Sequence, residues 1–128
     1  MKILAEISAG ELIDKLTILE IKLDHIADPG KRANVERERE SLAATLAQEL
    51  AEAEALRPLR GELKSVNARL WIVEDDLRRL EREGRFDDEF VTLARAVYQT
   101  NDRRARLKRE INEITRSEIV EEKSYEAY

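Results

Sequence analysis

The sequence predicts an all-α protein, an antiparallel bundle of about four helices that pair as coiled-coil hairpins. The first observation is a heptad seam. Spacings that alternate between three and four, typical of a helix packed against another helix, separate six apolar residues: Leu63, Val66, Leu70, Val73, Leu77 and Leu80. The second is composition: 40% of the 128 residues are charged, and only 4 glycines and 2 prolines are present. This composition leaves little room for a sheet or for long loops.

The composition also limits the kinds of site that the chain holds. With no cysteine and one histidine, disulfides and thiolate metal sites are ruled out, and we expect neither a metal nor another cofactor. A net charge of −5 argues against nucleic-acid binding. The first residues are too short and too charged for a signal peptide, and no apolar run approaches a membrane span. We therefore expect a single cytoplasmic domain over residues 1–128 that binds no membrane.

The first two elements are an N-terminal arm and a helix. Met1–Ile7 alternates loosely in polarity, which predicts a short strand or an extended arm. Ser8 and Glu11 form a capping box that starts a helix at about Ala9, and the turn residues 28–30 end it after Ile26.

Three further helices follow. The second is expected over about Lys31–Ala55, where alanines favour helix. Pro58 then allows either a kink or a break, and we favour a break. The third helix is expected over about Leu59–Glu83 with Gly84 as its C-cap, and the fourth runs from Asp87 or Asp88 to about Ile114. The tail after it, residues 117–128, has no clear helical period.

The first helix is apolar on two sides. Its main stripe comprises Leu12, Leu16, Leu19, Leu23 and Ile26. Ile18 and Ile21 lie roughly opposite, with Asp14 and His25 beside them. Such a helix is either the centre of a monomeric bundle or in contact with a second subunit. We favour a dimer interface formed by Ile18, Ile21 and His25, with His25 as a packing residue instead of a ligand.

The fourth helix has a polar break in its buried stripe. Asn101, Arg104 and Lys108 lie on the same face as the apolar residues that precede and follow them. If the third and fourth helices are antiparallel, Glu74 would meet Arg104 or Lys108. One interpretation is an ion pair that fixes the register of the helices, which we favour. The other is a polar pocket beside Trp71 for a phosphate, carboxylate or sugar.

Four segments also carry a resemblance to a known family: residues 10–22 (GELIDKLTILEIK), 66–75 (VNARLWIVED), 97–105 (VYQTNDRRA) and 121–125 (EEKSY). They resemble a family of uncharacterised bacterial proteins described only as a domain of unknown function. The resemblance implies no activity. It implies that certain polar positions belong to the family pattern, among them Asp14, Lys15, Thr17, Glu20 and Lys22. It also implies a docked C-terminal segment, with pairing to the N-terminal arm as one way to dock it.

Two shortlists result. The candidate ligand-binding residues are Asn67, Trp71, Glu74, Asp75, Tyr98, Asn101, Arg104 and Lys108. The candidate tail-docking residues are Glu121, Glu122, Lys123 and Tyr125.

The leading hypothesis for function is a non-enzymatic interaction or scaffold module, a homodimer that also takes a protein partner. The alternative is a binding protein or enzyme for a small phosphate- or sugar-linked anion, with its pocket between the third and fourth helices. In that case Arg104 and Lys108 would neutralise the anion, Glu74 or Asp75 would act as base or metal ligand, and Trp71 would form a wall of the pocket.

Overall fold

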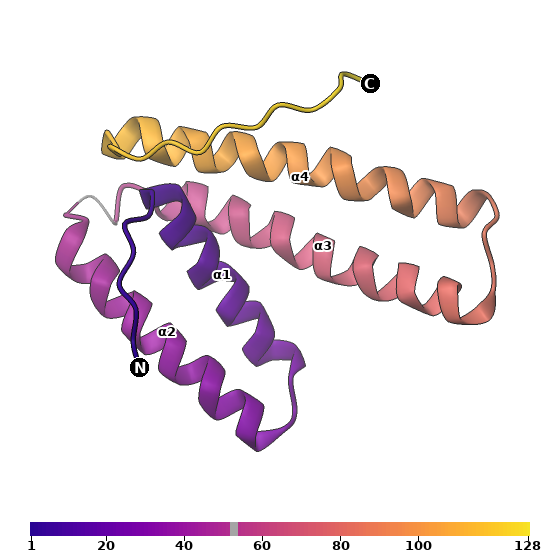
Figure 1. Cartoon of the computed structure of the whole chain (residues 1–128), viewed down its shortest axis with the longest axis horizontal. Helices are drawn as coiled ribbons and strands as arrows, with labels where there is room; N and C mark the ends of the chain where they lie inside the picture. Colours follow the sequence, from indigo (N-terminus) through magenta and orange to yellow (C-terminus); the bar gives the residue numbers. More distant parts are fainter. Residues whose placement is uncertain (52–53) are drawn as a thin grey trace.

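The computed structural model describes residues 1–51 and 54–128, and this part of the chain contains four helices and no strand. The helices are α1 (Ala9–His25), α2 (Pro29–Glu49), α3 (Arg57–Glu83) and α4 (Asp88–Thr115). They form two hairpins, α1–α2 and α3–α4, which meet at one end of the molecule and diverge toward the other (Figure 1). The all-α class predicted from the sequence is confirmed.

The helix ends follow local capping chemistry. The amide of Glu11 donates to the hydroxyl of Ser8 over 3.1 Å, and the amide of Lys31 donates to the carboxylate of Asp28 over 2.9 Å. Gly84 ends α3 in the left-handed region, at a φ of 67° that a residue with a side chain rarely adopts. The boundaries of three helices therefore lie close to the predicted ones.

The second helix is shorter than predicted. α2 ends at Glu49 instead of about Ala55, because Leu50 leaves the helix with extended backbone angles. The predicted segment includes residues 52–53, which lie outside the described residues. The side chain of Leu56, just before α3 begins, is buried in the core. Pro58 occupies the first turn of α3, where its missing amide costs no hydrogen bond, so the predicted break is confirmed.

α1 is the central helix of the fold, because it packs against each of the other three. The main core lies where the two hairpins meet, and its buried members are Leu12, Ile13, Leu16, Leu46, Leu56, Leu63, Val66, Leu107 and Ile111. The second apolar side of α1 is covered in part by the chain itself, since Ile21 is buried. The central-helix alternative therefore explains much of the double apolar pattern.

The α3–α4 hairpin extends beyond the end of α1. α1 has 17 residues, whereas α3 has 27 and α4 has 28. At 1.5 Å per residue, about 15 Å of the long hairpin extends past a helix of the length of α1. Val73 and Leu80 of the heptad seam are buried. Several apolar side chains of the hairpin are exposed, including Ile72 beside the end of α1 and Phe86 and Val91 toward the tip.

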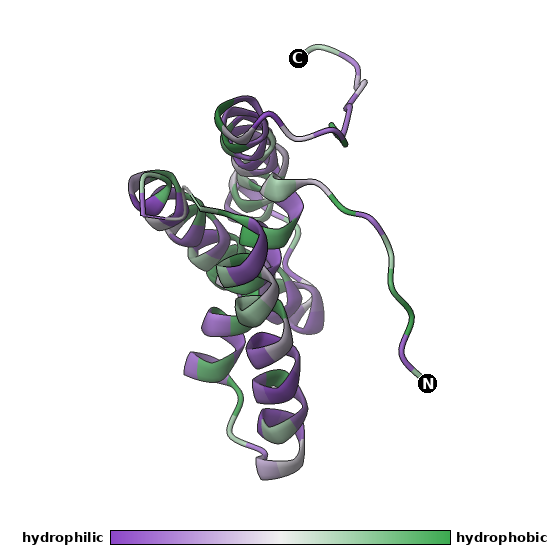
Figure 2. Ribbon diagram, turned by 90° about the vertical axis from the view of Figure 1, so that its left-hand side faces the viewer, coloured by the Kyte–Doolittle hydropathy of each residue, from purple (hydrophilic) through white to green (hydrophobic). Residues whose placement is uncertain are grey.

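The N-terminal arm and the C-terminal tail are both extended. They leave the body on the same side and then diverge, the arm coloured largely as hydrophobic residues (Figure 2). Met1–Ile7 has no assigned strand, so of the two predicted forms the extended arm is observed. The tail turns back at Arg116, whose φ is 53°, and runs along α4 (Figure 1). Among the described residues, no helix is both long and apolar enough to cross a membrane.

Candidate functional site

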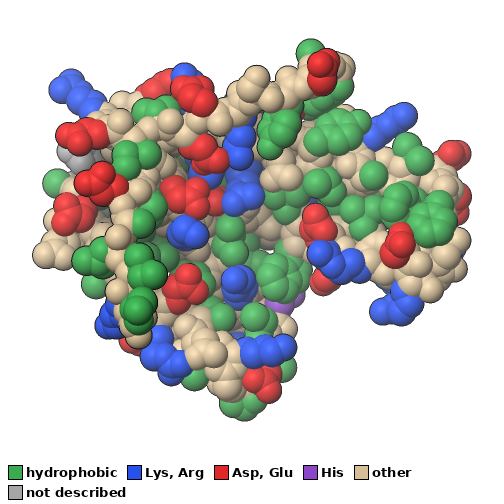
Figure 3. Space-filling view, in the orientation of Figure 1, with side chains coloured by type: hydrophobic (Ala, Val, Ile, Leu, Met, Phe, Trp, Pro, Cys, Tyr) green, Lys and Arg blue, Asp and Glu red, His purple; other side chains and the backbone are tan. Residues whose placement is uncertain are grey.

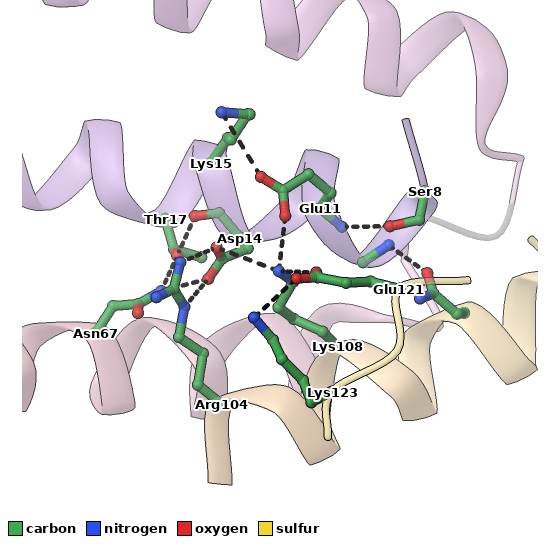
Figure 4. Close-up of polar contacts among 12 residues, drawn as sticks. Ser8, Glu11, Asp14, Lys15, Thr17, Asn67, Arg104, Lys108, Glu121 and Lys123 are labelled. Carbon is green, nitrogen blue, oxygen red and sulfur yellow. Dashed lines mark hydrogen bonds and ion pairs between the residues drawn. The ribbon is translucent and has the colours of Figure 1, made fainter. Parts of the chain in front are cut away.

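A cluster of charged and polar side chains lies where α1 crosses the α3–α4 hairpin (Figure 4). We call it the polar cluster, and its members are Glu11, Asp14, Thr17, Asn67, Arg104, Lys108 and Glu121. The space-filling view shows acidic and basic side chains gathered in the middle of this face, with apolar side chains on both sides (Figure 3). The cluster connects α1, α3, α4 and the tail.

Asp14 is the centre of the polar cluster. Its residue is 0% exposed, and its carboxylate accepts two hydrogen bonds from the guanidinium of Arg104, over 2.9 and 2.5 Å. The amide nitrogen of Asn67 donates to the same carboxylate over 2.8 Å. The paired, planar geometry is the strong form of a charge-assisted hydrogen bond. The bond to Asp14 raises the pKa of Arg104 above its ordinary value and outweighs the effect of burial.

A second cation, Lys108, joins α4 to α1 and to the tail. Its ammonium donates to Glu11 over 2.6 Å and to Glu121 over 2.8 Å, and it lies 4.0 Å from the carboxylate of Asp14. Burial lowers the pKa of Lys108, but the hydrogen bonds to Glu11 and Glu121 outweigh it and raise the pKa overall. The lysine is therefore charged over the physiological pH range.

The buried polar atoms of the polar cluster already have hydrogen-bond partners. Within residues 1–51 and 54–128, every buried side-chain nitrogen or oxygen has a hydrogen-bond partner. The carboxylate of Asp14 already accepts three hydrogen bonds, one from Asn67 and two from Arg104. Both cations already bind carboxylates of the same chain. Such an arrangement is suited to holding helices in register.

The pairing predicted for Glu74 is wrong. The carboxylate of Glu74 binds Arg78 one turn along α3, over 2.6 Å, and Arg104 binds Asp14 instead. The physical reason is that α1 lies across the α3–α4 hairpin, so that the polar face of α4 meets α1. The sequence did hold a signal for the missing partner, because Asp14 lies on the second apolar side of α1 near Thr17 and Ile18.

Six candidate ligand-binding residues line a cleft that we call the fork cleft, where α1 diverges from the α3–α4 hairpin. Its volume is about 450 Å³. Its lining residues are Ile18, Ile21, Asn67, Leu70, Trp71, Glu74, Asp75, Arg78, Asn101 and Arg104. The lining combines four apolar residues with charged and amide side chains. The remaining candidates, Tyr98 and Lys108, lie elsewhere, along the tail.

The three candidate dimer residues differ in accessibility. Ile21 is buried within the single chain, whereas Ile18 is half-buried and His25 is exposed. The imidazole of His25 stacks on the indole of Trp71, with ring centroids 4.9 Å apart and an angle of 17° between the planes. The stack holds the end of α1 against α3 beside the fork cleft. Only Ile18 and His25 remain accessible to a second chain.

The tail contacts α4 through ion pairs near its start and through an aromatic contact at its far end. Glu121 binds Lys108, Glu122 binds Arg109 over 3.0 Å, and Lys123 binds Glu121 over 2.9 Å. Tyr125 lines the space between the tail and α4. The hydroxyl of Tyr128 donates to Asp102 over 2.6 Å, and this bond raises the pKa of Tyr128.

We expect the contact of Glu121 with Lys108 to weaken only in strong acid. Hydrogen bonds from Lys108 and Lys123 lower the pKa of Glu121 to about 2 from an ordinary value near 4.5. A lowered pKa means that the contribution to docking is fully present above about pH 4.5 and is lost as the pH falls through about 2. Amide chemical shifts around Glu121, followed by NMR from pH 6 down to about pH 1, should move with a midpoint near this pKa. In the variant Glu121→Gln the transition should be absent, and an unchanged titration in that variant would contradict the assignment.

The polar positions of the first helix that the resemblance implied lie mostly at helix contacts. Asp14 and Thr17 belong to the polar cluster, and Lys15 pairs with Glu11 over 3.6 Å. Glu20 joins α1 to α3 through Arg60, at 2.5 Å, and Lys64, at 2.9 Å. Burial raises the pKa of Glu20, but its bonds to these two cations lower it overall.

Comparison with known proteins adds a family and no activity. The model of a family described as "Family of unknown function (DUF6165)" matches residues 1–128. No curated protein and no solved structure matches the chain. In the part of the chain that the structure describes, no three His, Cys, Asp or Glu side chains converge as they would around a metal ion.

Proposed function

The chain belongs to this family of unknown function, so no activity accompanies the match, and we propose from the geometry that it is a non-enzymatic interaction module that binds a second copy of itself. One observation carries the proposal: the fork cleft exposes apolar side chains to solvent, while the charged groups of the adjacent polar cluster already bind one another. Covering the apolar part of such a surface lowers the free energy more than binding an ion would.

The fork cleft has the composition of a protein interface. Ile18, Leu70 and Trp71 are half-buried, and Ile21 lies beneath them. Around them lie Glu74, Asp75, Arg78 and Asn101. Interfaces combine an apolar centre with a polar rim, and tryptophan and arginine are among the residues that contribute most to their affinity.

A second copy suits this cleft because its rim is self-complementary. Arg78 is largely exposed, and Asp75 has no ion-pair partner among the described residues. In a two-fold interface every contact occurs twice, so a contact of Asp75 in one copy with Arg78 in the other would form on both sides of the axis. The projecting α3–α4 hairpin, with Ile72 exposed, would add area next to the cleft.

The alternative function, binding of a small phosphate- or sugar-linked anion, has one observation in its favour. The fork cleft brings six of the candidate ligand residues together in a volume of about 450 Å³, and ligand sites typically have volumes of about 300–1,000 Å³. Against it, Arg104 and Lys108 are paired, and Glu74 and Asp75 would repel an anion. We therefore place the protein partner first.

Sedimentation velocity at micromolar concentration tests the proposal. We expect a dimer, and we expect the fluorescence of Trp71, the single tryptophan, to shift to shorter wavelength as the concentration rises. The variant Ile18→Lys puts an ammonium into the apolar centre and should weaken the dimer by about a hundredfold. A stable wild-type monomer would contradict the proposal.

Two controls separate the alternatives. Ile114→Lys makes the same change at an exposed isoleucine of α4 outside the cleft and should leave the dimer intact. Calorimetric titration with inorganic phosphate should give no binding heat in the wild type. A binding heat that disappears in Arg104→Gln would instead favour the anion-binding alternative.

A further inference from the structure

The C-terminal tail encloses a groove against α4. After the left-handed turn at Arg116, the tail is held near its start by the ion pair of Glu121 with Lys108. It is held at its far end by Tyr128, whose ring packs edge-on against Tyr98 with centroids 4.9 Å apart. Between the two attachments lies an open groove of about 1340 Å³. We call it the tail groove.

The tail groove offers both apolar side chains and unpaired backbone. Its apolar lining comprises Val97, Tyr98, Ala105, Tyr125, Ala127 and Tyr128. Residues 118–128 make no backbone-to-backbone hydrogen bond with any described residue. The tail therefore presents a free extended edge, to which another strand can add by ordinary β pairing.

The N-terminal arm is an extended segment with apolar side chains and unpaired backbone, which complements the tail groove. Residues 1–7 are extended and exposed, and Ile3 and Leu4 are 82% and 98% exposed. The backbone of these seven residues is likewise free of backbone-to-backbone hydrogen bonds within the described chain. An apolar, unpaired extended segment is unfavourable in water and tends to pair with another edge.

The root of the arm directs it away from the groove of its own chain. Ser8 is buried and caps α1, the amide of Ala9 donates to the hydroxyl of Ser117 over 3.3 Å, and the amide of Gly10 donates to Asn112 over 2.7 Å. From this fixed root the arm and the tail run apart (Figure 2). Folding back would require the chain to reverse within one residue of the buried cap.

We propose that the arm of one copy lies in the tail groove of a second copy, as a strand added to the edge of the tail. The proposal rests on the self-association proposed above. At about 3.3 Å per residue, seven residues reach about 23 Å, which covers the rise of about 17 Å along α4 from Val97 to Lys108. Reciprocal exchange of two arms gives a closed, two-fold dimer.

Charge selects the direction of the added strand. The far end of the groove carries Asp102 and Glu126. The near end carries Lys123 and Lys108, which already pair with the groove-lining carboxylates of Glu11 and Glu121, so the charges there are mixed. An arm antiparallel to the tail brings Lys2 to the acidic far end and Glu6 beside Lys123. A parallel arm would bring Glu6 to the acidic far end, which costs free energy. Antiparallel pairing with Glu6 opposite Lys123 brings Ala5 opposite Ser124.

Disulfide trapping tests the exchange, and the absence of native cysteine makes single cysteines specific reporters. Copies with Ala5→Cys are mixed with copies of different mass that carry Ser124→Cys, and the mixture is oxidised gently. We expect a disulfide between the two kinds of copy as the main mixed product. In the control, copies with Ala33→Cys, at an exposed site on α2, are mixed with the Ser124→Cys copies in place of Ala5→Cys. This mixture should give little mixed disulfide.

Charge reversal checks the direction of the strand. Lys2→Glu with Glu6→Lys in the arm should reduce the mixed disulfide to the level of the control. Lys123→Glu with Glu126→Lys in the groove should then restore it. A parallel arrangement would give the opposite result and overturn the proposed direction.

The outcomes separate this inference from the proposed function. A chain with both Ala5→Cys and Ser124→Cys that forms its disulfide internally, independent of concentration, would overturn the exchange between copies. A dimer that persists unchanged without residues 1–7 and gives no mixed disulfide would overturn this inference alone. A wild-type monomer in sedimentation would overturn both.

Discussion

Replacing Asp14 by alanine is expected to lower the free energy of unfolding by about 3 kcal/mol, because breaking a buried ion pair leaves a partner without compensation. The guanidinium of Arg104 would lose both of its carboxylate hydrogen bonds, and the amide of Asn67 would lose one of its two. The side chain of Arg104 is 29% exposed, so water would replace part of the loss and the estimate is at the lower end of the usual range. Urea denaturation followed by circular dichroism measures the difference.

The exposed pair of Glu74 and Arg78 provides the control for Asp14. Both side chains of this pair are accessible to water, so Glu74→Ala should change stability by at most about 0.5 kcal/mol. If Asp14→Ala costs no more than Glu74→Ala, the polar cluster does not hold the helices in register. A gain in stability on removal of Asp14 would also contradict this role, since it would indicate a strained binding site.

A double substitution examines the role of the charge itself. Asp14→Leu combined with Arg104→Met replaces both partners by apolar side chains and leaves no unpaired charge in the pair. We expect this variant to be more stable than Asp14→Ala, as is common when both members of a buried pair are replaced. Asn67 and Lys108 keep other partners, Thr17 and the carboxylates of Glu11 and Glu121. A double variant less stable than the single one would indicate that the cluster acts as a larger network.

Replacing Gly10 by alanine is expected to cost about 2–3 kcal/mol, although alanine favours helix. A Cβ atom at this position would lie 2.5 Å from the backbone oxygen of Lys108 and 2.9 Å from the side-chain oxygen of Asn112. The backbone oxygen belongs to α4, so α1 and α4 would have to separate. The bond from the Gly10 amide to Asn112 would lengthen with them. Thermal or urea denaturation measures the loss.

Gly61 provides the matched control for Gly10. It lies in α3, and a Cβ atom there would meet nothing within 4 Å. Gly61→Ala should therefore stabilise the protein by about 0.5–1 kcal/mol through helix propensity alone. Equal effects of the two substitutions, in either direction, would show that Gly10 is not a close-packing site.

Local patterns were sufficient to predict the helices. The heptad seam of α3 depends on residues three and four apart, and these meet on one face of any helix whatever surrounds it. Ser8 marks a helix end through its side-chain hydroxyl, and Pro58 and Gly84 do so through their backbone properties. All three lie at ends of the helices observed. The end of α2 was mispredicted, because the burial of Leu56 depends on the core and not on the residues around Leu50.

The polar break of α4 could likewise be found in the sequence, since Arg104 and Lys108 interrupt an apolar stripe. Their partners could not be found in this way. Glu74 was expected from the antiparallel hairpin alone, whereas Asp14 lies 90 residues away in the chain on a helix that crosses the hairpin. The carboxylate to which a cation binds depends on how helices cross, and helix periodicity carries no information about this.

The close approach of α1 and α4 at Gly10 is another feature that depends on packing and that the sequence alone does not predict. The sequence shows only a glycine in the first turn of a helix, two residues after its cap. Contact between two helix backbones makes a missing side chain necessary, and that contact exists only after α1 and α4 have packed. Which residues lie on one face of a helix is a local property of the chain. Which faces meet, and which charges they bring together, follows from the packing of the whole core.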